Sequence, residues 1–567
     1  MIKHLTSALF ILLFLATSPL HAQNFGWAKS FGNSNYSQEG MSITTDASGN
    51  VYTTGKGKGT IDFDPGSGVN NLTLDINGDI YIQKLDANGN FLWARSFGFI
   101  NSIPESGYAI ITDPAGNVYT LGVFFGTVDF NPGPGTYNLT AVNDTDLFLL
   151  KLDPNGTFIW AKSFGATGFE YAYDLELDHS GNIYIVGTFS GTADLDPHIS
   201  GVYSITATGA ENAFIQKLDA DGNFLWAKTF GGDLYTQAAS IAIDQSGNSY
   251  TAGAFAGTTD FDPGTGTNNT ISVQHDAFVV KLDPSGNFVW VRTFGGPESD
   301  YATSIDLDAL GNVYTTGTFI DTADFDPGTS VDSHICAGGT DAFVQKLDSA
   351  GNFLWARTYG GYYTEYLMSM DVDLYGNVYT QGVFNGSGDF DPGSGTTILN
   401  SGAVEDFFIQ KLSTNGNFLW AQSFGGSSQD WGHDLHVDEL GRIYSTGFFG
   451  QTVDFDKSPA VSNLTAIGSQ DAYILKLFQS EAGIEELNPE IQLTVFPNPS
   501  HGATHLSAGK ELTDAELFLT DIQGKVVWTA SYDSLKNATI QLPETSGIYF
   551  LHVKTKEGQQ TVKVVRE

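Results

Sequence analysis

Pairs of aspartates separated by one apolar residue are the first side chains in this sequence whose type and spacing could bind a metal ion. The Asp-Phe-Asp or Asp-Leu-Asp pattern occurs six times, and a further copy reads Asp129-Phe130-Asn131. Carboxylate oxygens two residues apart in a loop are ligands that Ca²⁺ accepts. The candidate calcium ligands are Asp62, Asp64, Asp260, Asp262, Asp324, Asp326, Asp389 and Asp391. We expect a structural role instead, without a cofactor, because such an aspartate can cap a turn while the apolar residue fills a core.

Dipeptides of an acid and an aromatic residue form a second group. They are Glu170-Tyr171, Asp300-Tyr301, Glu365-Tyr366 and Asp430-Trp431, with Tyr362 and Tyr363 close to the third. Flat rings beside carboxylates suit stacking on sugars or the binding of cationic groups. The alternative is that each acid anchors the start of a strand and the ring packs internally. Because the acid recurs periodically, the irregular aromatics Tyr362, Tyr363 and Trp431 are the better ligand-binding candidates.

Patterns typical of catalysis are scarce. His433 and His436 are close in sequence, but alternation along a strand does not give the helical spacing of a metal-ligand pair. The single cysteine, Cys336, lies in a variable segment. No phosphate loop or nucleophile elbow occurs in a suitable context. We therefore predict no catalytic residue, although 64 acidic residues leave a glycosidase-type carboxylate pair open.

These candidates are placed by a sequence repeat with a period of about 65 residues. One marker is a tryptophan in segments such as Phe-Leu-Trp-Ala-Lys, and another is an aspartate in a turn of the form Asp-x-x-Gly-Asn. The tryptophans are Trp27, Trp93, Trp160, Trp226, Trp290, Trp355 and Trp420. The aspartates are Asp46, Asp113, Asp178, Asp244, Asp308, Asp373 and Asp438. Seven copies in one register indicate a repeat architecture.

Each copy has the pattern of four strands. Residues 301–359 contain segments rich in β-branched and aromatic residues, separated by Asp- and Gly-containing turns. Repeated four-stranded units predict an all-β, seven-bladed β-propeller over 23–478, with extra length between the second and third strands. The first copy supplies only its tryptophan strand and the last copy lacks that strand. We expect the N-terminal strand to complete the last blade, with an open solenoid as the alternative.

The segment Gly-Asn-Val-Tyr-Thr-Thr-Gly-Thr-Phe followed by Asp-Ala-Phe-Val-Gln-Lys-Leu-Asp resembles the bacterial SBBP β-propeller repeat. The resemblance covers about residues 24–478. It implies a propeller fold and no general catalytic activity.

The two ends of the chain indicate export. Residues 1–22 have a basic start at Lys3, an apolar stretch at 8–16 and a small residue before the expected cleavage between Ala22 and Gln23. This pattern is typical of a secretory signal peptide, and no later apolar run is long enough to span a membrane. The net charge of −39 disfavours binding to nucleic acid or an anionic membrane.

After a polar linker at 479–490, residues 491–567 predict a small β-sandwich. The segments Val-Phe-Pro-Asn-Pro-Ser, Asp-Ile-Gln-Gly-Lys-Val-Val and Gly-Ile-Tyr-Phe-Leu-His-Val resemble the type A C-terminal sorting domain of the type IX secretion system of Bacteroidetes. The resemblance implies recognition by that secretion machinery and export through the periplasm and across the outer membrane. An ordinary accessory sandwich is the alternative.

Together these patterns predict an exported, non-enzymatic β-propeller at the cell surface or outside the cell. Its expected role is binding or adhesion to a glycan or an extracellular protein. A secreted polysaccharide-active enzyme and a structural surface component remain alternatives.

Overall fold

The computed structural model describes residues 23–566, with gaps at 99–104, 143–144, 199–200, 403, 480–492, 497, 499, 501, 522–525, 544, 546 and 556–557. The predicted signal peptide, with Ala22, and residues 480–490 of the predicted linker lie outside the described residues. Within the described part every regular element is a β-strand. These strands belong to two compact units, one over 24–478 and one whose described strands begin at Leu493.

The larger unit repeats one arrangement of four antiparallel strands. Its first strands, which lie innermost, are β2 (Glu39–Thr45), β6 (Ser106–Thr112), β12 (Glu170–Leu177), β18 (Tyr235–Ile243), β22 (Tyr301–Leu307), β28 (Glu365–Val372) and β34 (Trp431–Val437). The second strands are β3 (Val51–Asp62), β7 (Val118–Phe124), β13 (Ile183–Phe189), β19 (Ser249–Asp260), β23 (Val313–Phe319), β29 (Val378–Phe384) and β35 (Ile443–Phe449).

The two outer positions of each blade complete the sheet. The third strands are β4 (Asn71–Leu85), β10 (Asp146–Leu152), β16 (Asn212–Leu218), β20 (Asn269–Leu282), β26 (Asp341–Leu347), β32 (Asp406–Leu412) and β38 (Asp471–Gln479). The fourth strands are β5 (Phe91–Phe97), β11 (Phe158–Ala166), β17 (Phe224–Gly232), β21 (Phe288–Phe294), β27 (Phe353–Gly361), β33 (Phe418–Phe424) and β1 (Gln23–Phe31). The described strands thus form seven four-stranded units, consistent with the predicted seven blades.

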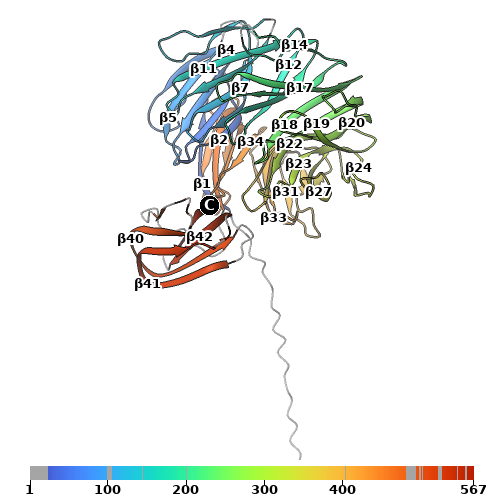
Figure 1. The fold of residues 1–567 in the computed structure, drawn as a ribbon. Helices are drawn as coiled ribbons and strands as arrows, with labels where there is room; N and C mark the ends of the chain where they lie inside the picture. The colour runs from blue at the N-terminus through green and yellow to red at the C-terminus, as the bar shows by residue number, and fades with distance from the viewer. Residues whose placement is uncertain are drawn as a thin grey trace, which may run out of the picture. The chain divides into compact units, whose positions relative to one another are not determined.

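The seven units form a closed ring. Each innermost strand contacts the innermost strands of the units on both sides, and β34 of the last unit contacts β2 of the first. Figure 1 shows β2, β18, β22 and β34 towards the middle of the ring and β5, β20, β24 and β33 towards its rim. The N-terminal β1 pairs with β38, so the first segment of the propeller completes the last blade as predicted.

The extra length between second and third strands forms a short hairpin. The separate hairpins pair β8 (Thr127–Asp129) with β9 (Asn138–Thr140), β14 (Thr192–Asp194) with β15 (Ser204–Thr206), β24 (Thr322–Asp324) with β25 (Ser333–Ile335), β30 (Ser387–Asp389) with β31 (Ile398–Asn400), and β36 (Thr452–Asp454) with β37 (Asn463–Thr465). In the first and fourth units the hairpin continues from β3 into β4 and from β19 into β20.

The apolar residue after each hairpin strand fills the core of its blade. Phe325 is 1% exposed and its ring centroid lies 5.0 Å from that of Phe343 on β26. Its backbone carbonyl accepts a hydrogen bond of 2.6 Å from Gln345 Nε2. Burying a side chain of this size stabilises the fold by about 2–3 kcal/mol, so each hairpin is held against its blade.

A lysine on the third strand joins neighbouring blades. Lys346 Nζ lies 3.2 Å from Asp308 Oδ2 of its own blade and donates a 3.2 Å hydrogen bond to the carbonyl of Thr414 in the next blade. At the junction of the last and first blades, Lys476 Nζ and Trp27 Nε1 both donate to the carbonyl of Ala87, at 2.8 and 3.2 Å. The equivalent lysines that donate to a turn carbonyl of the following blade are Lys84, Lys151, Lys217 and Lys281.

The C-terminal unit is one bent antiparallel sheet. Its strands are β39 (Leu493–Phe496), β40 (Ala503–Asp521), β41 (Val526–Gln541), β42 (Gly547–Thr555) and β43 (Gly558–Arg566). The first part of the long β40 pairs with β39 and its last part pairs with β42, while β41 pairs along both parts. A bridge between Ser500 and Arg566 brings the two edges together, so the sheet nearly closes around its apolar core.

Removing the closing strand tests how far the ring depends on β1. We expect deletion of residues 24–31 to lower the melting temperature of the propeller and to promote self-association, because β38 then presents an unpaired edge. Calorimetry and light scattering measure the two effects. Deletion of 493–566 is the control and is expected to leave the melting transition of the propeller unchanged; equal effects of the two deletions would contradict this role of β1.

Candidate functional site

The innermost strands of the ring surround an axial channel. A cavity of about 580 Å³ is lined by residues from all seven innermost strands. Because side chains alternate across a strand, every second residue of these strands points to the axis. Equivalent positions of the repeat carry Asp174, Ser240 and Asp434 in one layer, and Glu176, Asp306 and His436 in the next.

Four channel aspartates accept hydrogen bonds from the free edge of the next innermost strand. Asp434 Oδ2 accepts from the backbone N–H of Ile43 at 2.9 Å, across the junction between the last and first blades. The same contact joins Asp174 to Ile241 (3.0 Å), Asp306 to Val372 (2.8 Å) and Asp371 to Val437 (2.7 Å). An edge N–H without a partner strand needs such an acceptor, so these acids complete the blade junctions.

Serines at equivalent positions extend this network. Ser240 Oγ donates to Asp174 Oδ2 at 2.8 Å and accepts from the N–H of Ile305 at 3.3 Å. Ser369 Oγ donates to Asp434 Oδ1 at 2.7 Å. Each carboxylate in this layer is therefore held in one orientation.

The protonation of the channel acids follows from their burial. Burial raises the pKa of Asp174 to about 6, and burial together with the charges of Asp174 and Asp371 raises the pKa of Glu176 to about 8. Burial and the charge of Asp371 also raise the pKa of Asp306 well above its usual value. At neutral pH the channel thus carries less negative charge than its number of carboxyl groups suggests.

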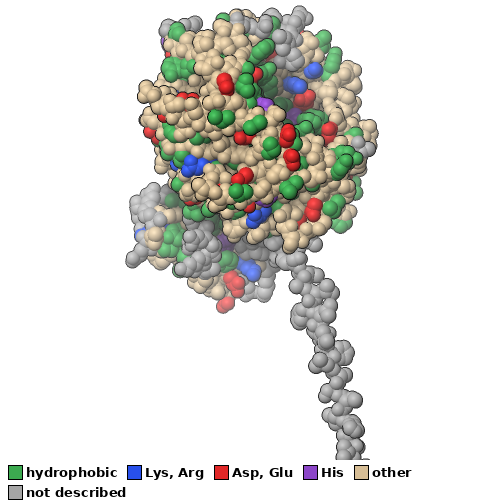
Figure 2. Space-filling view, turned by 90° about the vertical axis from the view of Figure 1, so that its right-hand side faces the viewer, with side chains coloured by type: hydrophobic (Ala, Val, Ile, Leu, Met, Phe, Trp, Pro, Cys, Tyr) green, Lys and Arg blue, Asp and Glu red, His purple; other side chains and the backbone are tan. Residues whose placement is uncertain are grey.

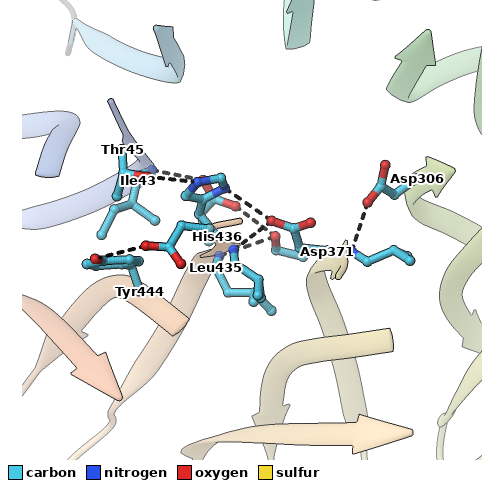
Figure 3. Close-up of polar contacts among 12 residues, drawn as sticks. Ile43, Thr45, Asp306, Asp371, Leu435, His436 and Tyr444 are labelled. Carbon is cyan, nitrogen blue, oxygen red and sulfur yellow. Dashed lines mark hydrogen bonds and ion pairs between the residues drawn. The ribbon is translucent and has the colours of Figure 1, made fainter. Parts of the chain in front are cut away.

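His436 lies between a carboxylate and a hydroxyl group. Its Nδ1 is 3.1 Å from Asp371 Oδ2 and its Nε2 is 3.1 Å from Thr45 Oγ1, as Figure 3 shows. Burial opposes the charged imidazole, but the hydrogen bond and charge of Asp371 outweigh it and raise the pKa of His436. The order of hydroxyl, imidazole and carboxylate is that of an activated nucleophile with its base and orienting acid.

Tyrosines lie near the starts of several innermost strands, and two of them, Tyr108 and Tyr173, line the channel. The rings of Tyr171 and Tyr173 stack with centroids 6.2 Å apart and are 42% and 36% exposed. Tyr235 Oη donates a 2.6 Å hydrogen bond to Gln237 Oε1, two residues further along β18. We call the five rings on β6, β12, β18 and β22 the tyrosine row: Tyr108, Tyr171, Tyr173, Tyr235 and Tyr301. Figure 2 shows histidine side chains recessed in a hollow of one face of the propeller.

The predicted aromatic candidates separate into two places. Tyr171 and Tyr301 belong to the tyrosine row, whereas Tyr362 and Tyr363 lie in the segment before β28, 77% and 54% exposed. Tyr366 is the second residue of β28 and is also exposed. Trp431 stacks on Phe448 with centroids 5.9 Å apart. Tyr108, Tyr173 and Tyr235 were not predicted from the sequence, although their positions near strand starts were a signal for them.

The predicted acidic partners lie beneath the surface. Glu170, Asp300, Glu365 and Asp430 are at most 3% exposed. The oxygens of Asp430 accept backbone hydrogen bonds from Gly426 and Gly450 at 2.7 and 2.9 Å. The structure therefore places the acids inside, where Asp300, Glu365 and Asp430 accept backbone hydrogen bonds beside the start of their innermost strands.

The calcium candidates act on backbone groups of their own hairpins. Asp62 Oδ1 accepts from the N–H groups of Asp64 and Asn70 at 3.1 and 2.7 Å, and Asp64 Oδ1 accepts from Gly66 at 2.8 Å. The same pattern recurs at Asp260 and Asp262, Asp324 and Asp326, and Asp389 and Asp391. Among the described residues, no group of three or more His, Cys, Asp or Glu side chains is arranged to hold a metal ion.

The comparison with protein families decides the nature of the C-terminal unit. Residues 494–567 match the secretion system C-terminal sorting domain. This unit is a type IX sorting domain. The sorting domain marks the protein for secretion to the cell surface or the extracellular space and for interaction with the type IX machinery. Residues 289–318, from β21 to β23, match a beta-propeller repeat, which confirms the predicted resemblance for this copy. No helix capable of crossing a bilayer occurs in the described part of the chain.

Relatives of the whole chain are distant. An uncharacterized WD repeat-containing protein, L264, of Acanthamoeba polyphaga mimivirus is 24% identical over 533 residues, covering 79% of this chain and 38% of the relative. The regulatory protein FlaEY of Caulobacter vibrioides is 25% identical over 211 residues, covering 36% of this chain and 22% of the relative. The chain therefore spans less than half the length of either relative.

Similarity to solved structures is also low. Puromycin hydrolase aligns at 12% identity and a TM-score of 0.40, covering 84% of this chain and 59% of that chain. The extracellular domain of the one component system BT4673 of B. thetaiotaomicron aligns at 10% identity and a TM-score of 0.16, covering 95% and 98%. Neither likeness bears on activity.

Asp434 provides a test of the channel network. We expect Asp434→Ala to lower the free energy of unfolding by about 1–3 kcal/mol, because the N–H of Ile43 and two serine hydroxyls lose their acceptor. Urea denaturation measures the loss. The matched control is Glu176→Gln, which keeps the side-chain shape and is expected to change stability by less than about 0.5 kcal/mol. An unchanged Asp434→Ala variant would show that the network is not structural.

Proposed function

We propose that this exported propeller is a non-enzymatic binding and adhesion module, and that a glycan chain lies along its tyrosine row. The observation that carries the proposal is the continuity of the row over four neighbouring blades, with Tyr171 and Tyr173 both more than one-third exposed. Sugar rings present apolar faces that stack on aromatic rings, while their hydroxyl groups need polar partners. The tyrosine hydroxyls and Gln237 offer such partners.

The rigidity of the ring supports this role. Tyr301 stacks on His275 with centroids 5.0 Å apart, and His275 in turn packs against Tyr235 at 5.3 Å. Rings held in place before binding lose little conformational entropy when a ligand arrives. Secretion by the type IX route places this surface where extracellular glycans and proteins are available.

Substitution of the two stacked tyrosines tests the glycan proposal. We expect the double variant Tyr171→Ala, Tyr173→Ala to weaken glycan binding by about tenfold or more, because two stacking surfaces are lost. Glycan-array retention followed by titration calorimetry measures the change, and a melting curve confirms that the fold is intact.

Tyr362→Ala is the matched control, because Tyr362 is exposed but lies outside the row. It is expected to bind as the unmodified protein does. Loss of binding in Tyr362→Ala alone would move the site to the segment before β28, and retention of extracellular protein but no glycan would contradict the glycan assignment.

A hydrolase is the second candidate, because Thr45, His436 and Asp371 lie in the hydrogen-bond order of a nucleophile, a base and an acid. The hydrogen bond and charge of Asp371 raise the pKa of His436, so at a given pH a larger share of the imidazole is protonated and unable to accept the hydroxyl proton, which argues against this candidate. We expect no turnover of polysaccharides or simple esters by the protein, and no difference between it and Thr45→Val. Turnover that is lost in both Thr45→Val and His436→Gln would contradict the non-enzymatic proposal.

A further inference from the structure

Buried carboxyl groups face one another at five junctions between blades. The first acid belongs to a third strand, which it begins in β10, β26 and β32 and within which it lies in β4 and β20, and the second stands at the start of the innermost strand of the next blade. The pairs are Asp79 with Glu105, Asp146 with Glu170, Asp276 with Asp300, Asp341 with Glu365, and Asp406 with Asp430. Asp341 and Glu365 are 4% and 0% exposed, so this pair of carboxyl groups is shielded from solvent.

The two carboxyl groups of a pair converge over one glycine. A Cβ placed on Gly360 would lie 2.6 Å from Asp341 Oδ1 and 2.7 Å from Glu365 Oε2. A Cβ on Gly98 would lie 2.1 Å from Asp79 Oδ1 and 2.7 Å from Glu105 Oε2. The glycine of the Phe-Gly or Tyr-Gly segment therefore leaves room for two carboxyl groups side by side.

Backbone hydrogen bonds satisfy some carboxyl oxygens of these pairs and leave others without a partner. Both oxygens of Asp300 accept backbone hydrogen bonds, from Gly296 at 2.6 Å and Ile320 at 3.2 Å. Glu365 accepts one such bond on Oε2, from Gly361 at 3.1 Å, while its Oε1 is buried without a hydrogen-bond partner among the described residues. Asp341 accepts on Oδ2, from Ala337 at 2.8 Å. Oδ1 of the first acid is buried without a partner among the described residues in Asp79, Asp276, Asp341 and Asp406.

The two remaining junctions supply an internal comparison. Gln38 takes the place of the second acid beside Asp471, and its Oε1 accepts from the N–H of Lys58 at 2.8 Å, as a carboxylate oxygen does elsewhere. Asn212 and Thr236 replace both acids at the other junction. In these two cases Oδ1 of the first residue does accept hydrogen bonds, at 3.3 Å in Asp471 and at 3.4 Å in Asn212. A neutral amide thus fits this position, and the partnerless oxygen occurs where two acids meet.

We propose that each facing pair binds one proton at neutral pH, held between Oδ1 of the first acid and the second carboxyl group. The bound proton gives the partnerless oxygen a hydrogen bond to donate and removes one of two like charges from a buried site. Loss of this proton places two carboxylates face to face, so the blade junctions are weakened as the pH rises.

Few other charged groups face these pairs. Asp75 lies near Asp79, Glu298 near Asp300, and the Cys336 thiol near Asp341. Lys457 is the cation near Asp406 and Asp430, where it opposes proton binding. Burial, followed by the charge of the partner acid, raises the pKa of Asp406 to about 8, while burial is the main cause that raises the pKa of Asp300 and of Glu365 to about 7.

The sign of the pH effect follows from proton linkage. These folded-state pKa values lie above those of unfolded aspartate and glutamate, so the folded protein binds more protons than the unfolded chain at intermediate pH. The contribution of these carboxyl groups to the free energy of unfolding is complete below about pH 4, and it is lost as the pH rises through about 6 to 8. Most acids with backbone hydrogen bonds have the opposite effect, which makes this behaviour distinctive.

Melting temperatures of the full chain between about pH 5 and pH 9 test the proposal. We expect the melting temperature to fall across this range, and to fall less in Glu365→Gln, which is more stable than the unmodified protein at the alkaline end. Asp341→Asn removes the first acid of the same pair. Asn212, at the equivalent position of another blade, shows that the fold accepts asparagine at this position. The matched control, Asp221→Asn, removes one exposed carboxylate and is expected to keep the full pH dependence.

Two results would overturn the proposal. One is a pH dependence that neither Glu365→Gln nor Asp341→Asn changes. The other is a rise in melting temperature with millimolar calcium chloride at alkaline pH that a chelator reverses and Glu365→Gln abolishes, which would show that the pairs bind a divalent cation and not a proton.

Discussion

In six blades a lysine near the end of the third strand contacts both its own blade and the next one. Lys346 pairs with Asp308, lies over the ring of Tyr314 with its Nζ 4.4 Å from the ring centroid, and donates to the carbonyl of Thr414 in the next blade. Lys476 makes the closing contact to Ala87. A charged hydrogen bond of this kind contributes about 1.5–3 kcal/mol, and its repetition around the ring makes each blade dependent on the next. The channel and the exposed aromatic side chains keep their geometry because the propeller is closed.

This dependence also explains the charge of the protein. The net charge of −39 suggests a cationic partner, but many of its carboxylates accept backbone N–H groups. Asp308 caps a turn, Asp324 organises a hairpin, and Asp434 accepts from the free edge of the first blade. A carboxylate that already accepts two or three backbone hydrogen bonds has little acceptor capacity left for a ligand. The acidity therefore reflects the supply of hydrogen-bond acceptors to backbone N–H groups more than what the protein binds.

The candidate site combines the two consequences of this construction. The channel wall is occupied by acids and serines that hold adjacent blades together, and a protonated Glu176 reduces its charge. The aromatic side chains near the starts of the innermost strands differ from these acids and serines, because Tyr171 and Tyr173 keep exposed faces. A surface that is aromatic, preorganised and carried outside the cell by a sorting domain favours binding over chemistry.

The repeat, the strand pattern, the closing strand and the C-terminal sorting domain were predictable from the sequence alone, because these depend on local spacing and on motifs within short segments; the N-terminal signal peptide stays a prediction. The sequence also placed the hairpin aspartates correctly as residues of tight turns. It could not separate Tyr171 from Glu170, since neighbouring residues on a strand point in opposite directions and only the curvature of the ring decides which faces solvent. Nor could it bring Asp341 to Glu365 or Thr45 to His436, because those partners lie on different blades. Only the closed tertiary structure brings such residues together, since their contact depends on how whole blades pack.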